Sequence, residues 1–191
     1  MTPRIVAIAG STRTESFNRR LLSVAVAGAR AAGGEVEVID LKTLKLPLFD
    51  QDDERDHGLP PGAIALKAAF NASHGLLLAC PEYNSSISGV LKNAIDWASR
   101  TAPGESPLQS FRGKVAALVS ASPGALGGLR SLVTVRSILG NIGVVVLPDQ
   151  VAIPNAAQSF QGDELTDAAR KPKVEQLARD LVTMATKLAT R

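Results

Sequence analysis

The chain has 191 residues, of which 45% are hydrophobic and 20% are charged, and its formal net charge is +3. This length favours one domain, 1–191, and the composition is that of a globular protein with a sizeable core, which excludes extensive disorder. The small net charge, without a basic run, gives no reason to expect nucleic acid or a membrane surface as a partner. The only cysteine, Cys80, excludes an internal disulfide and a metal site built from several thiolates.

Five apolar runs recur along the chain with little polar alternation, which is typical of strands buried on both faces of a sheet. They are Ile5–Ala9, Val36–Ile39, Leu76–Cys80, Val115–Val119 and Val144–Leu147. Stretches with helical spacing lie between and after them, at Leu21/Ala25/Ala29, Leu91/Ile95/Ala98, Leu132/Val135/Leu139/Ile142 and, from about Pro172, Val174/Leu177/Leu181/Ala185/Leu188. The repeated strand–helix order predicts an α/β fold, a doubly wound sheet of five parallel strands with helices on both faces.

Ligands of such sheets bind beyond the carboxyl ends of the strands. Three loops at those ends are rich in hydroxyls, amides or glycine, namely Gly10–Asn18, Pro81–Ser86 and Ser120–Gly128. All three follow strands of the same parallel sheet, so we expect them along one edge of it. That edge is the predicted binding site.

The first loop leads into a helix, whose N-terminus favours an anion through unpaired N–H groups and the helix dipole. It offers hydroxyl, amide and guanidinium donors in Ser11, Thr12, Arg13, Ser16 and Asn18. The alternative is that Thr12 and Glu15 form a capping box and that the other hydroxyls cap the helix. The loop contains neither G-x-G-x-x-G nor G-x-x-x-x-G-K-[ST], so a single terminal phosphate is a better ligand than a dinucleotide or a nucleoside triphosphate.

The second loop contains Pro81, Glu82, the only tyrosine, Tyr83, and Asn84. Backbone groups and the Asn84 amide could hold a planar heterocycle against Tyr83, or the tyrosine could simply cover the core. The third loop offers Gly124, Gly127 and Gly128. These glycines either let the backbone approach a ligand closely or begin the next helix, and their position at the edge of the sheet favours a ligand.

Each of these loops carries part of a longer motif. The motifs are Gly-Ser-x-Arg-x-x-Ser-x-Asn from Gly10, Pro-Glu-Tyr-Asn-x-Ser-x-x-Gly-x-Leu-Lys-Asn-Ala-Ile-Asp-Trp from Pro81 to Trp97, and Ser-x-Ser-Pro-Gly-x-x-Gly-Gly-x-Arg from Ser120 to Arg130. Together they resemble the NADPH-dependent FMN reductases, a family with a flavodoxin-like fold that includes bacterial quinone, chromate and azo-dye reductases. The resemblance covers nearly the whole chain in the right order, and the middle motif is the most specific.

The resemblance implies FMN as the cofactor and NADPH or NADH as the electron donor. It implies that Ser11, Arg13, Ser16 and Asn18 hold the FMN phosphate, that Pro81, Glu82, Tyr83 and Asn84 lie along the isoalloxazine and ribityl chain, and that Ser122, Gly124 and Gly127 close the other side. Two positions depart from the family. Ser88 stands where proline is usual before Gly89, which would loosen that loop, and Leu132 stands where glutamine is common, which argues against a polar contact there.

A bound flavin would take a hydride from the nicotinamide and then pass two electrons to an acceptor such as a quinone, free flavin, chromate or an azo compound. No catalytic side chain is therefore assigned. The alternative is an electron carrier like flavodoxin, which the net charge of +3 disfavours because docking on basic partners needs an acidic face. A short-chain dehydrogenase is excluded because Ile87, not lysine, lies four residues after Tyr83.

The remaining expectations concern location, assembly and inert residues. The start of the chain has no secretory cleavage pattern, which predicts a cytoplasmic protein without a membrane span. Cys80 is expected in the core, and no metal is expected because His57 and His74 have no partner at metal-ligand spacing. The acidic stretch Asp50–Asp56 is expected to be a solvated loop. Trp97 could cap the core or anchor a partner subunit. By the resemblance, the helix from Leu91 to Trp97 forms part of the interface of a homodimer, or of a dimer of dimers, which favours the second role.

Overall fold

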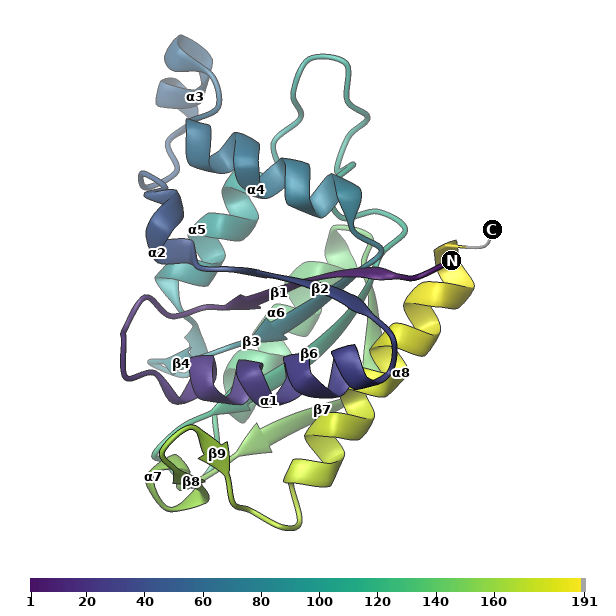
Figure 1. The fold of residues 1–191 in the computed structure, drawn as a ribbon. Helices are drawn as coiled ribbons and strands as arrows, with labels where there is room; N and C mark the ends of the chain where they lie inside the picture. The colour runs from purple at the N-terminus through teal and green to yellow at the C-terminus, as the bar shows by residue number, and fades with distance from the viewer. Residues whose placement is uncertain (190–191) are drawn as a thin grey trace.

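The computed structural model describes residues 1–189. Their central sheet consists of five parallel strands, β1 (Arg4–Ala9), β2 (Glu35–Ile39), β3 (Gly75–Ala79), β6 (Val115–Ala121) and β7 (Val145–Ile153). Their order in space is β2-β1-β3-β6-β7, and Figure 1 shows helices packed around them. This is the flavodoxin-like order, so the predicted doubly wound sheet is confirmed.

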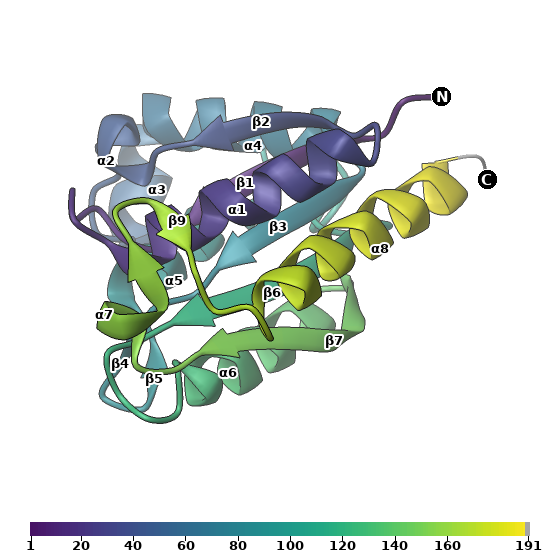
Figure 2. The ribbon, with the colours of Figure 1, turned by 60° about the horizontal axis from the view of Figure 1, so that its bottom comes forward.

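Helices cover both faces of the sheet. Figure 2 shows one face, where α1 (Phe17–Ala31) lies beside α8 (Lys171–Ala189). The opposite face carries α4 (Pro61–Ala72), α5 (Gly89–Ala98) and α6 (Leu129–Asn141). The loops contain the short helices α2 (Leu41–Leu44), α3 (Gln51–His57) and α7 (Ala156–Ser159), and the hairpins β4 (Glu82–Tyr83) with β5 (Ser86–Ile87) and β8 (Phe160–Gln161) with β9 (Glu164–Leu165).

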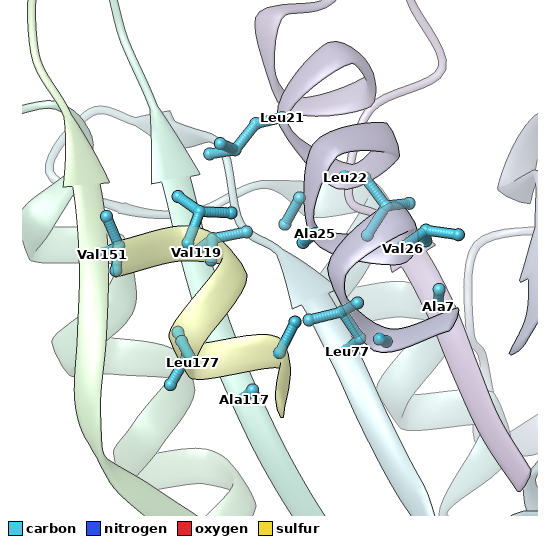
Figure 3. Close-up of a cluster of buried hydrophobic side chains, with 14 of the residues drawn as sticks. Ala7, Leu21, Leu22, Ala25, Val26, Leu77, Ala117, Val119, Val151 and Leu177 are labelled. Carbon is cyan, nitrogen blue, oxygen red and sulfur yellow. The ribbon is translucent and has the colours of Figure 1, made fainter. Parts of the chain in front are cut away.

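Side chains of the inner strands alternate between two cores. In β3, Leu77 packs in the core under α1 and α8, whereas Leu76 and Leu78 pack in the core under α4, α5 and α6. Figure 3 shows the first core, in which Leu77 lies near Val26 of α1 and Leu177 of α8 joins from the other helix. Because helices cover both faces of β1, β3 and β6, water reaches neither side, and every position can be apolar.

The prediction that all five strands are buried on both faces is wrong for the two outer strands. β2 forms one edge, and its Val38 is 52% exposed. β7 forms the other edge and runs through Pro148 to Ile153, well past the expected end at Leu147. An edge strand tolerates proline because one side of its backbone has no strand to pair with, and the register with β6 shifts along this stretch.

The acidic stretch Asp50–Asp56 forms a helix, so the predicted loop is also wrong. Asp50 caps α3 by accepting a hydrogen bond from the Asp52 N–H at 2.8 Å. Acidic residues fill the first turn and Arg55 lies in the last, which matches the helix dipole. None of its residues is buried, so caps and charges form this helix where hydrophobic periodicity gives no signal. The Glu54 carboxylate ties it to Arg100 at 2.8 Å.

Trp97 is an internal anchor, and the interpretation that it anchors a partner subunit is wrong. Its side chain is 1% exposed, and its indole N–H donates to the Pro47 carbonyl at 2.8 Å. Its ring meets Phe49 edge-on, with the ring centroids 5.0 Å apart. Trp97 therefore fastens α5 to the segment before α3 of the same chain.

Cys80 follows β3 and is fully buried, as expected. Burial raises the pKa of its thiol well above the usual range, which keeps it protonated and unreactive at neutral pH. In the part of the chain that the structure describes, no cluster of three or more histidine, cysteine, aspartate or glutamate side chains could hold a metal ion. None of the helices within residues 1–189 has the length and apolar character needed to span a membrane.

Inner strands and edge strands should respond differently when an apolar side chain is truncated to alanine. We expect Leu77→Ala, at a fully buried position, to lower the free energy of unfolding by about 2–5 kcal/mol, because it leaves a cavity between the sheet and α1. Val38→Ala, on the exposed edge strand, should cost less than about 1 kcal/mol. Urea unfolding of both variants measures the difference, and equal losses would contradict this account of the sheet.

Candidate functional site

The three polar loops begin at the carboxyl ends of β1, β3 and β6, which are neighbours in the sheet and end at the left of Figure 1. Hydrogen bonds join their first residues. The Gly10 N–H donates to the Ala79 carbonyl at 2.9 Å, and the Ser120 hydroxyl donates to the Cys80 carbonyl at 2.6 Å. The structure therefore brings the three loops together on one rim.

In the first loop, the N-terminus of α1 is open to an anion. Ser16 is the N-cap residue, but its hydroxyl makes no capping hydrogen bond, so the first N–H groups of α1 are left for another acceptor. The alternative capping box of Thr12 and Glu15 does not form, because the helix starts after Ser16 and the Glu15 carboxylate pairs with Arg20 instead. Ser11 is buried and accepts a hydrogen bond from a backbone N–H of the same loop.

Arg13 and Asn18 of the first loop differ in burial and in hydrogen bonding. The Arg13 side chain is exposed, and its guanidinium donates a long hydrogen bond of 3.4 Å to the Glu15 carbonyl. Asn18 is buried, and its amide forms two hydrogen bonds with the backbone of Ala121, at 2.8 and 3.0 Å. These bonds occupy the amide oxygen and one N–H, which leaves a single N–H for a ligand. Asn18 therefore fastens the first loop to the end of β6.

The second loop is a tight hairpin. Its central residues, Asn84 and Ser85, both have positive φ, 49° and 65°, as a type I′ turn between β4 and β5 requires. Tyr83 is 49% exposed, so the alternative that it covers the core is wrong. Pro81 is buried and would lie 3.1 Å from a Cβ at Gly10, which shows how closely the first two loops approach.

Glu82 points to the third loop. One of its carboxylate oxygens contacts the Arg130 guanidinium at 2.7 Å, and the other accepts a hydrogen bond from the Arg130 backbone N–H at 3.0 Å. The Glu82 side chain is 10% exposed. Sequence reasoning assigned no role to Arg130, although this residue ends the third motif.

The third loop contains one glycine, Gly124, where a Cβ would fit without a clash, and two glycines where it would not. A Cβ at Gly127 would lie 2.6 Å from the backbone at the end of β7, and one at Gly128 would lie 1.9 Å from the Ser120 hydroxyl. Both have positive φ, and Gly128 is the N-cap of α6, so packing and the start of a helix account for them. Gly124 is open, and its N–H donates to the Ser122 hydroxyl at 3.2 Å.

Ser88 and Leu132, the two residues that depart from the family's motifs, lie in different surroundings. Ser88 is the N-cap of α5, where it accepts a hydrogen bond from the Leu91 N–H at 3.2 Å and donates to the Gly10 carbonyl at 2.7 Å. Its φ of −67° is one that proline also adopts, and the hydrogen bond that its hydroxyl donates to Gly10 is a contact that proline could not make. Leu132 is fully buried in the core under α6 and makes no polar contact, as expected.

Two cavities flank the first loop. One of about 260 Å³ lies between α1 and β2, where Arg19 and Asp40 form an ion pair at 2.9 Å. The other, of about 280 Å³, lies between α2 and α5 and is lined by Thr12 and Val90. Neither contains a residue of the second or third loop, so the candidate site is the open rim between the loops rather than either cavity.

An anion-binding helix terminus, a half-exposed tyrosine and an open glycine loop on one rim fit a ligand with a phosphate and a planar ring, such as FMN. The fold and this rim define a flavodoxin-like α/β protein. The family model of the NADPH-dependent FMN reductases matches residues 3–158, and the chain belongs to this family of oxidoreductases. The resemblance seen in the three motifs is thereby confirmed.

Individual proteins that are similar to this chain are also named as reductases. The chain is 38% identical to an NAD(P)H-dependent FMN reductase of Pseudomonas aeruginosa over 91% of both chains. It is 34% identical to the quinone reductase of Escherichia coli, over 75% of this chain and 73% of that protein. A flavoenzyme NAD(P)H:(acceptor) oxidoreductase from Paracoccus denitrificans has the same fold, with a TM-score of 0.80 at 26% identity over 97% of this chain and 98% of that one.

Ser88 should stabilise the rim. We expect Ser88→Ala to lower the free energy of unfolding by about 1–2 kcal/mol, because it removes a helix cap and the hydrogen bond to Gly10. Ser137→Ala, at an exposed position of α6, is the matched control and should stay within about 0.5 kcal/mol of the wild type. Urea unfolding distinguishes them, and a silent Ser88→Ala would argue against the tether.

Proposed function

We propose that the chain, as a single flavodoxin-like domain of residues 1–191, holds FMN on the rim between its three loops and passes electrons from NADPH or NADH to a small-molecule acceptor. Family membership and the names of its relatives support this activity. The observation that carries the proposal is the uncapped N-terminus of α1 beside the exposed Arg13, on the same rim as Tyr83. When bound, FMN supplies the hydride and electron transfer.

The phosphate belongs at the first loop. Ser11, Arg13, Ser16 and Asn18 are proposed to hold it together with the first N–H groups of α1. The loop also contains an acid, Glu15, but the Arg20 guanidinium balances its charge. A phosphate dianion would thus meet N–H donors, hydroxyls and a guanidinium, which are the groups that bind it best.

The planar ring belongs between the second and third loops. Pro81, Glu82, Tyr83 and Asn84 are proposed to lie along the ring and the ribityl chain, and Ser122, Gly124 and Gly127 to close the other side. The lack of a Cβ at Gly124 lets the backbone approach the ring closely. The openness of the rim leaves room for donor and acceptor to bind in turn at one face of the ring.

Small molecules are the proposed acceptors, with quinones first. Relatives include the quinone reductase of Escherichia coli and a 2-hydroxy-1,4-benzoquinone reductase of a Burkholderia species. An open face favours acceptors of many shapes, so free flavin, chromate and azo compounds remain candidates. A flavodoxin-like electron carrier is the second candidate, and the net charge of +3 argues against it because such a carrier docks through an acidic face.

A homodimer, or a dimer of dimers, is the proposed assembly, working in the cytoplasm. Most apolar side chains of α5 are buried in their own core, and Val90, which is 36% exposed, is the exception, so α5 offers a partner a small apolar surface. The outer side of α6 is a better candidate, because Leu129 is 41% exposed and Val133 is 59% exposed. Both follow the rim loops, so a second copy docked there would lie close to the site.

The purified protein, loaded with FMN and mixed anaerobically with NADPH or NADH, should lose its yellow flavin absorbance without any partner protein. Subsequent addition of a quinone should restore the colour. A yellow protein that neither nicotinamide bleaches would support the electron carrier. A protein that refuses added FMN would contradict both flavin functions.

The Arg13 assignment makes a sharper prediction. Arg13→Ala should raise the Kd for FMN by about 10- to 100-fold, because a charge-assisted contact with phosphate is lost. The Kd for riboflavin, which has no phosphate, should hardly change. Arg179→Ala, at an exposed position of α8, is the matched control. Fluorescence titration measures the Kd values of the wild type and both variants for FMN and for riboflavin. An unchanged Kd of Arg13→Ala for FMN would refute the phosphate assignment.

A further inference from the structure

The Glu82–Arg130 ion pair joins the second loop of the rim to the start of α6, which follows directly on the third loop. Glu82 lies in β4, after the β3 strand, and Arg130 lies in the first turn of α6, after the third loop. Three polar contacts of 2.7 to 3.0 Å connect them, two from the guanidinium and one from the Arg130 backbone N–H. The contact spans 48 positions of the sequence, so it is a tertiary feature.

The geometry of this pair restricts movement. A planar guanidinium and a backbone N–H approach the carboxylate from two directions, which fixes its orientation more firmly than a single ammonium contact would. The Glu82 carboxylate is also 10% exposed, whereas that of the exposed pair Lys171–Glu164 is 68% exposed. The Arg130 side chain is 54% exposed, so it is the carboxylate side of the pair that is shielded from the solvent screening that makes most surface ion pairs weak.

The β4–β5 hairpin, which carries Glu82, needs tertiary contacts to be stable. Its two strands are only two residues each, and an isolated hairpin of this size is not stable in water. Its turn also places Asn84 and Ser85 at positive φ, which costs free energy for residues other than glycine. Contacts with α6 therefore hold the hairpin, and the ion pair is the charged part of them.

The charge of the pair also suits the proposed ligand. Glu82 is the only acidic residue among the proposed FMN-binding positions, and a free carboxylate there would repel an anionic flavin. Arg130 compensates that charge and turns the carboxylate toward α6. The backbone of the hairpin, rather than the Glu82 side chain, is then left to contact the ring.

We propose that Glu82 and Arg130 are a positioning pair that sets the separation between the second and third loops, and thereby the shape of the surface that receives the planar ring. The proposal rests on the proposed function, because it assumes that FMN binds at this rim. Neither residue is catalytic. The pair acts through the hairpin at Tyr83 on one side and the glycine loop at Gly124 on the other.

The test is a double-mutant cycle on ligand binding. Apoprotein of Glu82→Gln, Arg130→Gln and the double variant is titrated with FMN and with riboflavin. Each single variant should weaken riboflavin binding by about tenfold, since one charge-assisted contact is lost. The double variant should bind no more weakly than the weaker single variant, because both substitutions remove the same interaction. Riboflavin reports on the ring alone, which separates this effect from that of Arg13.

A spectroscopic readout and a rescue variant exclude a merely structural role. The visible circular dichroism of bound FMN should change in both single variants, because the ring surroundings shift. Arg130→Lys should recover part of the affinity, since it keeps the charge but loses the fork geometry. Arg136→Gln is the matched control, because Arg136 lies on the same helix and its guanidinium donates hydrogen bonds to Gln150 and the Pro148 carbonyl, away from the three loops. It should change neither affinity nor the spectrum.

The outcomes are distinguishable. The positioning pair would be overturned, and the proposed function left intact, by either of two results. One is an additive loss of riboflavin affinity in the double variant, and the other is single variants with the affinity and the circular dichroism of the wild type. An Arg136→Gln variant as weak as Arg130→Gln would also overturn it, because general damage to α6 would then explain the loss. A wild-type protein that binds no FMN would overturn the proposed function, and the positioning pair with it.

Discussion

Parallel strands cannot be joined by tight turns, so each strand of this sheet returns through a helix on one of its faces, and every carboxyl end emerges on the same edge. That constraint explains two features at once. The inner strands β1, β3 and β6 are apolar on both sides because helices cover them, and the loops after these three strands are neighbours although the chain separates them widely. A ligand site follows from the connectivity before any particular side chain is considered.

The loops on this rim are held by their own contacts. Asn18 fastens the first loop to the end of β6, Ser88 joins α5 to Gly10, and Glu82 links the hairpin to Arg130. Several polar residues of the motifs thus serve the loops themselves. The groups left for a ligand are the N–H groups at the start of α1, the exposed Arg13 and open backbone, which suits a protein whose cofactor carries the chemistry.

Both the open rim and the charge distribution favour a small diffusing acceptor over a docked protein. The two neighbouring cavities reach the rim at its first loop alone, through Ser11 and Thr12, and the net charge of +3 gives no strong field to steer a partner. Exposed apolar side chains lie at the start of α6, beside the rim, and the proposed dimer would bury Leu129 and Val133 there. A second copy on that side would narrow the access to the rim.

The sequence by itself determined the inner strands, the helices α1, α5, α6 and α8 and the three motifs, because hydrophobic periodicity and loop composition are local properties, whereas the helix α4 was not predicted. Only the tertiary structure decided which strands form the edges, that α3 is a helix held by caps and charges, and that Trp97 packs inward. The same holds at the site. The first motif predicted an anion-binding loop. The hydrogen bond of Asn18 to the Ala121 backbone and the ion pair of Glu82 with Arg130 join segments that are far apart in the chain and meet only when the sheet is assembled.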